Sequence, residues 1–131
     1  MFPPHLCIGV GADEKIMARY DHLPIYKSIY DLILYFFKLA NGFRKDYKYG
    51  LAQEIEGLLT KLMDIIIEAN NIEDKSNKLK EGLVVVERIK FKARLLHELK
   101  VMKVTSYEFF FKQLIEISKQ FENWLNWSQA H

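Results

Sequence analysis

The hydrophobic residues from Pro24 to the C-terminus recur every three or four positions, the spacing that places side chains on one face of an α-helix. This pattern predicts four helices, over residues 24–41, 46–71, 76–102 and from 105 to near the C-terminus. Each predicted helix has one apolar stripe that is expected to be buried. The four stripes, in chain order, are Tyr26, Tyr30, Ile33, Phe37 and Ala40; Leu51, Ile55, Leu58, Leu62, Ile65 and Ala69; Leu79, Val86, Ile89, Ala93 and Leu96; and Tyr107, Phe110, Leu114, Ile117, Phe121 and Trp124.

Residues with helix-boundary preferences lie at the ends of these segments. Pro24 suits a first helical turn, and Asn41 followed by Gly42 suits a stop. Asp46 is expected to cap the second helix, and Thr105 with Glu108 has the spacing of a capping box for the fourth. Because long helices joined by short connections run antiparallel, the predicted fold is all-α, an up-down-up-down four-helix bundle.

The first 22 residues do not share the helical pattern. They are predicted to form an N-terminal arm, either flexible or, if the natural start is Met17, not native; the bundle is assigned residues 23–128. The chain begins without a basic leader, and its apolar runs are far shorter than the roughly 20 residues of a membrane span. We therefore expect a cytoplasmic protein without membrane contact.

The composition agrees with a folded helical domain. Half of the 131 residues are hydrophobic, and the six glycines and three prolines are too few for the many turns of a β-sandwich. Cys7 is the only cysteine, which excludes an internal disulfide and a thiolate zinc site and fits a reducing compartment.

The net charge of +2 hides an uneven distribution along the chain. Residues 47–74 carry two basic and six acidic side chains, whereas residues 75–103 carry nine basic and three acidic ones. On a helical wheel, the outward arc of the third helix holds Lys80, Arg88, Lys92 and Arg94, while Lys78 and Lys90 lie nearer its core stripe. Clustered cations of this kind give salt-sensitive binding to phosphates, so these six are the candidate nucleic-acid contacts, with a solvated face as the alternative.

A second apolar set falls on the outward arc of the same helix. It consists of Val84, Phe91, Leu95 and Leu99, where a monomeric bundle normally has polar residues. The set predicts an interface with another subunit or partner, edged by arginines that tolerate partial burial. Scattered exposed apolar residues are the alternative.

Residues for catalysis are not found in a usable arrangement. No glutamate precedes a histidine by three positions, as the di-iron bundles require, and His97 has Arg94 at that spacing. Asp64 and Glu68 are one helical turn apart without further ligands, and Gly9-Val10-Gly11 lacks the following glycine of a dinucleotide-binding loop. We therefore expect no catalytic residue, no metal and no cofactor.

The order of several short segments resembles a known family, the accessory variability determinant (Avd) proteins of diversity-generating retroelements. The resemblance covers residues 23–128 and rests on the segments Leu23-Pro24-Ile25-Tyr26, Tyr30-Asp31-Leu32, Tyr47 to Ile55, Ile67-Glu68-Ala69-Asn70, Val86-Glu87-Arg88-Ile89, Arg94-Leu95-Leu96, Tyr107 and Trp124-Leu125. Two positions depart from the family pattern: Ala52 stands where glycine is frequent, and Glu54 where a basic residue is common.

The resemblance implies a four-helix bundle that assembles as a ring, typically a homopentamer, with a basic surface. Such proteins bind the retroelement's reverse transcriptase and, in a salt-dependent way, RNA and DNA, and they support the mutagenic copying of template RNA into cDNA without catalysis of their own. Arg88 and Arg94, with Lys90 and Lys92, match the family's basic helix best. The alternative is the similar four-helix-bundle family encoded in intervening sequences of ribosomal-RNA genes, which implies a self-associating scaffold of unknown role.

Overall fold

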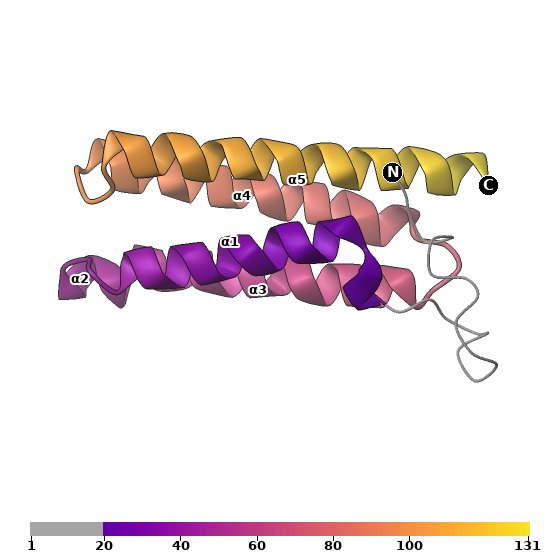
Figure 1. Cartoon of the computed structure of the whole chain (residues 1–131), viewed down its shortest axis with the longest axis horizontal. Coiled ribbons are helices and arrows are strands. Elements are labelled where there is room, and N and C mark those ends of the chain that lie inside the picture. Colours follow the sequence, from indigo (N-terminus) through magenta and orange to yellow (C-terminus); the bar gives the residue numbers. More distant parts are fainter. Residues whose placement is uncertain (1–19) are drawn as a thin grey trace.

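The computed structural model describes residues 20–131, which fold into four long helices lying alongside one another (Figure 1). The elements are η3 (Tyr20–His22), α1 (Pro24–Ala40), α2 (Lys45–Lys48), α3 (Leu51–Asn70), α4 (Ser76–Glu98) and α5 (Val104–Ala130). This described part has no strand, so the prediction of an all-helical four-helix bundle is confirmed. None of its helices is long and apolar enough to cross a membrane. The predicted arm lies outside the described residues as far as position 19.

The chain passes along the bundle four times (Figure 1). From α1 it reaches the end where α2 lies, returns through α3, runs along α4 to the α2 end again and finishes with α5. The neighbouring pairs are α1 with α3, α3 with α4, α4 with α5, and α5 with α1. Each long helix thus has two neighbours and one face left to the outside.

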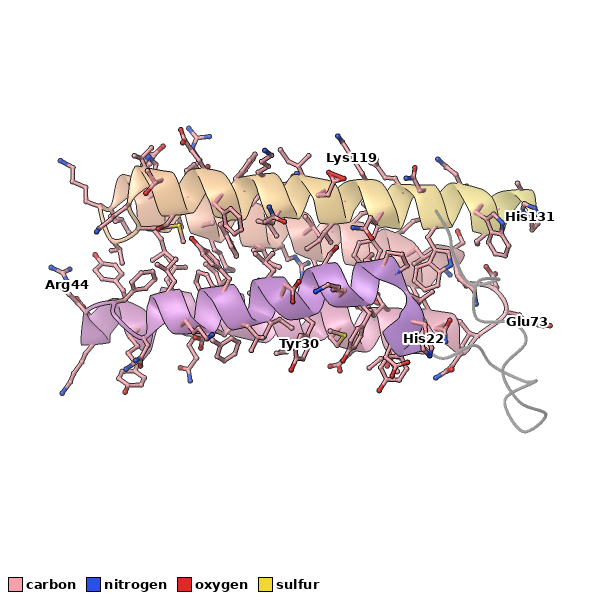
Figure 2. The ribbon with its side chains drawn as sticks, viewed as in Figure 1. His22, Tyr30, Arg44, Glu73, Lys119 and His131 are labelled. Atoms are coloured by element: carbon pink, nitrogen blue, oxygen red, sulfur yellow. The ribbon has the colours of Figure 1, made fainter. Side chains whose placement is uncertain are left out.

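The predicted stripe of α1 is one residue out of register at four of its five positions, and only Ala40 is buried as predicted. The buried residues are Ile25, Ile29, Leu32, Phe36 and Ala40. Tyr30 and Phe37, which were expected inside, are exposed, and Figure 2 shows Tyr30 on the outer side of the helix. Two parallel apolar stripes exist on this helix. The stripe without tyrosines is buried, because a tyrosine hydroxyl at the surface keeps its hydrogen bonds to water.

The predicted second helix is divided by Gly50. Its backbone (φ −118°, ψ −105°) interrupts the helix between α2 and α3. A Cβ at this position would lie 2.7 Å from the carbonyl oxygen of Asp46, so the close approach requires glycine. Asp46 lies inside α2 and does not cap it; Arg44 is at the cap position and makes no side-chain cap bond. Downstream, Ala52 and Leu59 are fully buried whereas the predicted Leu51 and Leu58 are only partly so.

The connection between α4 and α5 ends α4 with a Schellman pattern. The amide of Lys100 donates to the carbonyl of His97 at 2.9 Å, and that of Val101 to Leu96 at 2.9 Å. The short connection that follows is anchored by buried Met102. Helix α5 begins at Val104, and the cap position, Lys103, makes no side-chain cap bond. The predicted capping box is therefore wrong, because Thr105 already lies within the helix.

The core stripes of α4 and α5 match the predictions. All five predicted residues of α4 are buried, as are those of α5 except the half-buried Tyr107. The sequence pattern did not indicate the close packing of Gly82, where a Cβ would lie 2.5 Å from Cε1 of Phe121. Glycine at this position lets α4 and α5 pack closely.

Candidate functional site

The outward face of α4 follows directly from its buried face. Because Leu79, Ile89 and Leu96 are fully buried, the residues on the opposite side of the helix point away from the bundle. The helix is contacted by α3 on one flank and α5 on the other. Its side chains therefore fall into three groups: those toward α3, those toward α5 and those facing outward.

Four apolar residues form an exposed row on the outward face of α4, which we call the α4 row. They are Val84, Phe91, Leu95 and Leu99, and they are between 37% and 61% exposed. Arg88 stands one turn after Val84 and completes the helical spacing of the row. The single chain thus presents the apolar surface that an interface requires.

A shallow groove lies beside the row, between α3 and α4. It has a volume of about 390 Å³ and is lined by Glu54, Gly57 and Leu58 of α3 and by Arg88 and Lys92 of α4. Apart from its chain neighbours and the backbone of its own helix, no atom lies within 4 Å of the place where a Cβ of Gly57 would be, so the wall is open there. The groove extends the apolar row toward α3.

Two of the six candidate cations bind the acidic helix α3. Lys92 Nζ lies 2.8 Å from Oε1 of Glu54, and Lys78 Nζ lies 2.6 Å from Oε1 of Glu68. Lys78 also contacts Glu81 at 3.2 Å, and this hydrogen bond lowers the pKa of Glu81 below its ordinary value. The hydrogen bond to Glu68, and after it the one to Glu81, raises the pKa of Lys78. Lys92 was expected on the outward arc but is half-buried on the flank of α4 that packs against α3. Its ammonium group lies opposite Glu54 of α3 there.

Two further cations pair within α4. Lys90 Nζ is 3.0 Å from Glu87 and lies 5.5 Å from the ring centroid of Phe111 in α5, so it is held on that flank. Arg94 Nε donates to Glu98 at 3.0 Å, and this bond raises the pKa of Arg94. Arg94 remains largely exposed, so its guanidinium is still accessible to a phosphate.

Arg88 and Lys80 remain as the cations of α4 that point outward without an ion pair to any described residue. The structure thus gathers Arg88, Arg94 and Lys80 around the α4 row and assigns Lys78, Lys90 and Lys92 to contacts within the bundle. The two α3 carboxylates that pair with Lys78 and Lys92 were not predicted, although the acidic composition of residues 47–74 was the available signal. Residues 20–131 hold no group of three or more His, Cys, Asp or Glu side chains placed to bind a metal ion.

Comparison with protein families gives one decisive result: the model of the bAvd-like family matches residues 23–128. This chain belongs to the bAvd-like family. The match spans all five α-helices except the last residues of α5. Comparisons with curated proteins and with solved structures gave no significant match.

Glu54, one of the two positions that depart from the family pattern, forms an ion pair in this bAvd-like chain. Where a basic residue was expected, the glutamate forms the ion pair with Lys92 across the groove between α3 and α4. This carboxylate therefore adds a negative charge to α3 and neutralises the positive charge of Lys92 on α4. This part of the surface is less basic than the cation count of α4 alone indicates.

Proposed function

We propose that this bAvd-like chain is a non-catalytic accessory protein of a diversity-generating retroelement. In this proposal it binds the element's reverse transcriptase together with template RNA and cDNA, and it supports mutagenic retrohoming. Its antiparallel bundles assemble into a ring, a homopentamer, through the α4 row. The family match carries the proposal, and the exposed α4 row edged by Arg88 and Arg94 supports it.

Self-association is tested by light scattering on the purified chain. A pentamer has about five times the 15.5 kDa mass of the single chain. Phe91→Glu with Leu95→Glu places two carboxylates in the row, and we expect single chains with unchanged helicity because both side chains are exposed in the isolated bundle. Val104→Glu, at an exposed valine of α5, is the matched control. A wild-type mass near that of one chain would refute the ring.

Nucleic-acid binding is tested by the salt dependence of template-RNA affinity. Replacing Arg88 and Arg94 with alanine should lower the affinity and make the logarithmic salt slope shallower by roughly 0.7–0.9 per lost phosphate contact. Lys119→Ala, on the outer side of α5 (Figure 2), is the control for loss of an exposed positive charge. Unchanged binding of the double variant would remove Arg88 and Arg94 from the site.

The alternative, a self-associating scaffold without nucleic-acid contact, is favoured by one observation. Four of the six predicted cations of α4 form ion pairs with carboxylates of the bundle. The two functions separate in a co-purification of the chain with the retroelement's reverse transcriptase and template RNA. The scaffold function predicts a ring that retains neither.

A further inference from the structure

Two turns far apart in the sequence meet at one end of the bundle. The turn from α1 to α2 contributes Gly42, Phe43 and Arg44, and the turn from α4 to α5 contributes Leu99, Lys100 and Val101, to one cavity of about 280 Å³. Figure 2 shows Arg44 at this end and Glu73 at the opposite one. The cavity opens between two short backbone segments rather than along a helix.

This end is strongly basic. Residues 41–50 and 99–107 carry five cations, Arg44, Lys45, Lys48, Lys100 and Lys103, which we call the basic end, and a single carboxylate, Asp46. Asp46 lies 3.7 Å from Arg44. The nearest carboxylates along the chain beyond these turns are Glu98, which binds Arg94, Glu108 in the first turns of α5, and Glu54 and Glu56 of α3. Glu54 binds Lys92, and Glu56 interacts electrostatically with Lys48. The turns at the other end are acidic, with Asp21, Glu73 and Asp74 against Lys75.

The cations of the basic end differ from those of α4 in their pairing. Among the described residues, Lys45, Lys100 and Lys103 have no ion pair, and Lys48 donates only to the amide oxygen of Asn41, at 3.0 Å. On α4, by contrast, most cations are neutralised by carboxylates one turn away or on α3. A phosphate that approaches the basic end therefore displaces no carboxylate from these three lysines.

Aromatic rings are interleaved with these cations. Tyr49 is 63% exposed, and the ammonium of Lys48 lies 5.5 Å from its ring centroid. The guanidinium of Arg44 lies 5.0 Å from the ring centroid of Tyr47. Exposed rings beside cations are the combination that binds single-stranded nucleic acid, since bases stack on the ring while phosphates contact the cations.

The backbone at Lys100 gives an independent reason to assign the lysine a function. Its φ angle is 65°, in the left-handed region where a Schellman motif normally has glycine. A side chain at this position costs stability, and no described residue pairs with its ammonium group. Strained backbone of this kind clusters at ligand-binding sites, so it supports a contact of the Lys100 side chain outside the bundle.

We propose that the basic end is a binding site for single-stranded nucleic acid, with phosphates held by Lys45, Lys100 and Lys103 and one base stacked on Tyr49. The proposal rests on the proposed function for nucleic-acid binding itself, but it places a contact on the turns rather than on α4. An acidic protein segment is the competing occupant, and the test below distinguishes it.

The test uses Lys100→Gly in the full chain, because this variant separates binding from folding. Glycine relieves the left-handed backbone, so the thermal midpoint should rise. Affinity for a fluorescent single-stranded RNA of 20 nucleotides should nevertheless fall about fivefold at 0.1 M salt, the effect of one lost phosphate contact, and the salt slope should become shallower by about 0.7. Adding Lys103→Ala should bring the loss to about 25-fold.

The stacking contact is tested by Tyr49→Leu. We expect about a fivefold loss of affinity for single-stranded RNA with an unchanged salt slope, since stacking releases no counterions. Duplex RNA of the same length should bind this variant as it binds the wild type. An equal loss for both RNAs would overturn the assignment to single strands.

The controls separate this proposal from the proposed function. If wild type binds RNA while Lys100→Gly, Lys103→Ala and Tyr49→Leu bind like Lys119→Ala, the basic end is overturned and the accessory function stands. If wild type binds no RNA, the nucleic-acid part of the proposed function fails and this proposal with it. A loss of reverse-transcriptase binding in Lys100→Gly with RNA affinity intact would assign the end to an acidic protein segment instead.

Discussion

The packing of Gly82 against Phe121 predicts opposite effects of the same substitution at two glycines. Gly82 and Phe121 are both buried, and a Cβ at Gly82 would lie 2.5 Å and 2.7 Å from two carbons of the ring. Because Phe121 is fully buried, its ring must shift within the core to admit a methyl group at Gly82. Gly57 in α3 is exposed, and a Cβ there would meet nothing within 4 Å.

The magnitude follows from two terms. Alanine replaces glycine in a helix interior with a gain of about 1 kcal/mol at either position. Overpacking of a filled core subtracts about 1–3 kcal/mol at Gly82 only. We therefore expect Gly57→Ala to stabilise the fold by about 0.5–1 kcal/mol, and Gly82→Ala to change it by between about 0 and 2 kcal/mol in the destabilising direction.

Urea unfolding followed by circular dichroism measures both free energies of unfolding. The comparison is made in the Phe91→Glu, Leu95→Glu background, so that self-association does not contribute to the apparent stability. Phe121→Leu, added to Gly82→Ala, should recover part of the loss because it removes the ring carbons that the new methyl group meets. Equal free-energy changes for the two alanine variants would show that the contact between Gly82 and Phe121 carries no cost.

Three further predictions concern the ends and flanks of the helices. Gly50→Ala should destabilise the fold by about 1–3 kcal/mol in urea unfolding, because its Cβ would lie 2.7 Å from a backbone carbonyl oxygen; an unchanged midpoint would contradict this. Lys75 donates from Nζ to the carbonyl of Ala69 at 2.8 Å, so Lys75→Met should cost about 1 kcal/mol. Burial lowers the pKa of Lys75, so the unfolded chain binds more protons between that lowered pKa and 10.5, and wild-type stability should rise with pH there relative to Lys75→Met. Burial raises the pKa of Glu56, so stability should fall as pH rises through 4.5 to the raised value, and Glu56→Gln should abolish that fall in a pH series of thermal midpoints.

The helices themselves were predictable because their apolar residues recur at the helical spacing, even where a helix carries two apolar stripes. In α4 the buried residues Ile89 and Ala93 are each flanked by two charged residues, so the core stripe was distinguishable from the second apolar set on the outward arc. In α1 almost every position is apolar, and two stripes one residue apart fit the same spacing. Ile29 is buried rather than Tyr30 because the tyrosine keeps its hydroxyl in water when it stays at the surface. The spacing of apolar residues contains no information about this difference.

The candidate site was predictable only in part, because pairing depends on neighbouring helices. A helical wheel places Lys92 relative to α4 but contains nothing about α3, where Glu54 lies 38 positions earlier in the chain. The basic end was missed for a related reason: its cations come from two turns that are about 55 residues apart and that the fold alone brings together. The requirement for glycine at positions 50 and 82 was not predicted, because it depends on the group that packs against each glycine. These groups are the carbonyl of Asp46 and the ring of Phe121.

Ion pairing also decides which cations contribute most to phosphate binding. A phosphate that binds Lys92 must first displace Glu54 from a half-buried ammonium, so part of the Coulombic gain is spent on breaking an existing pair. At Lys100 or Lys103 no described carboxylate has to be displaced, and the whole attraction is available to the incoming phosphate. Equal alanine substitutions should therefore have unequal effects on RNA affinity, larger at Lys100 and Lys103 than at Lys78 and Lys92. If Lys92→Ala weakened RNA binding as much as Lys103→Ala, displacement of Glu54 would cost little. Each cation of α4 would then contribute equally to RNA affinity, whether or not it is paired with a carboxylate.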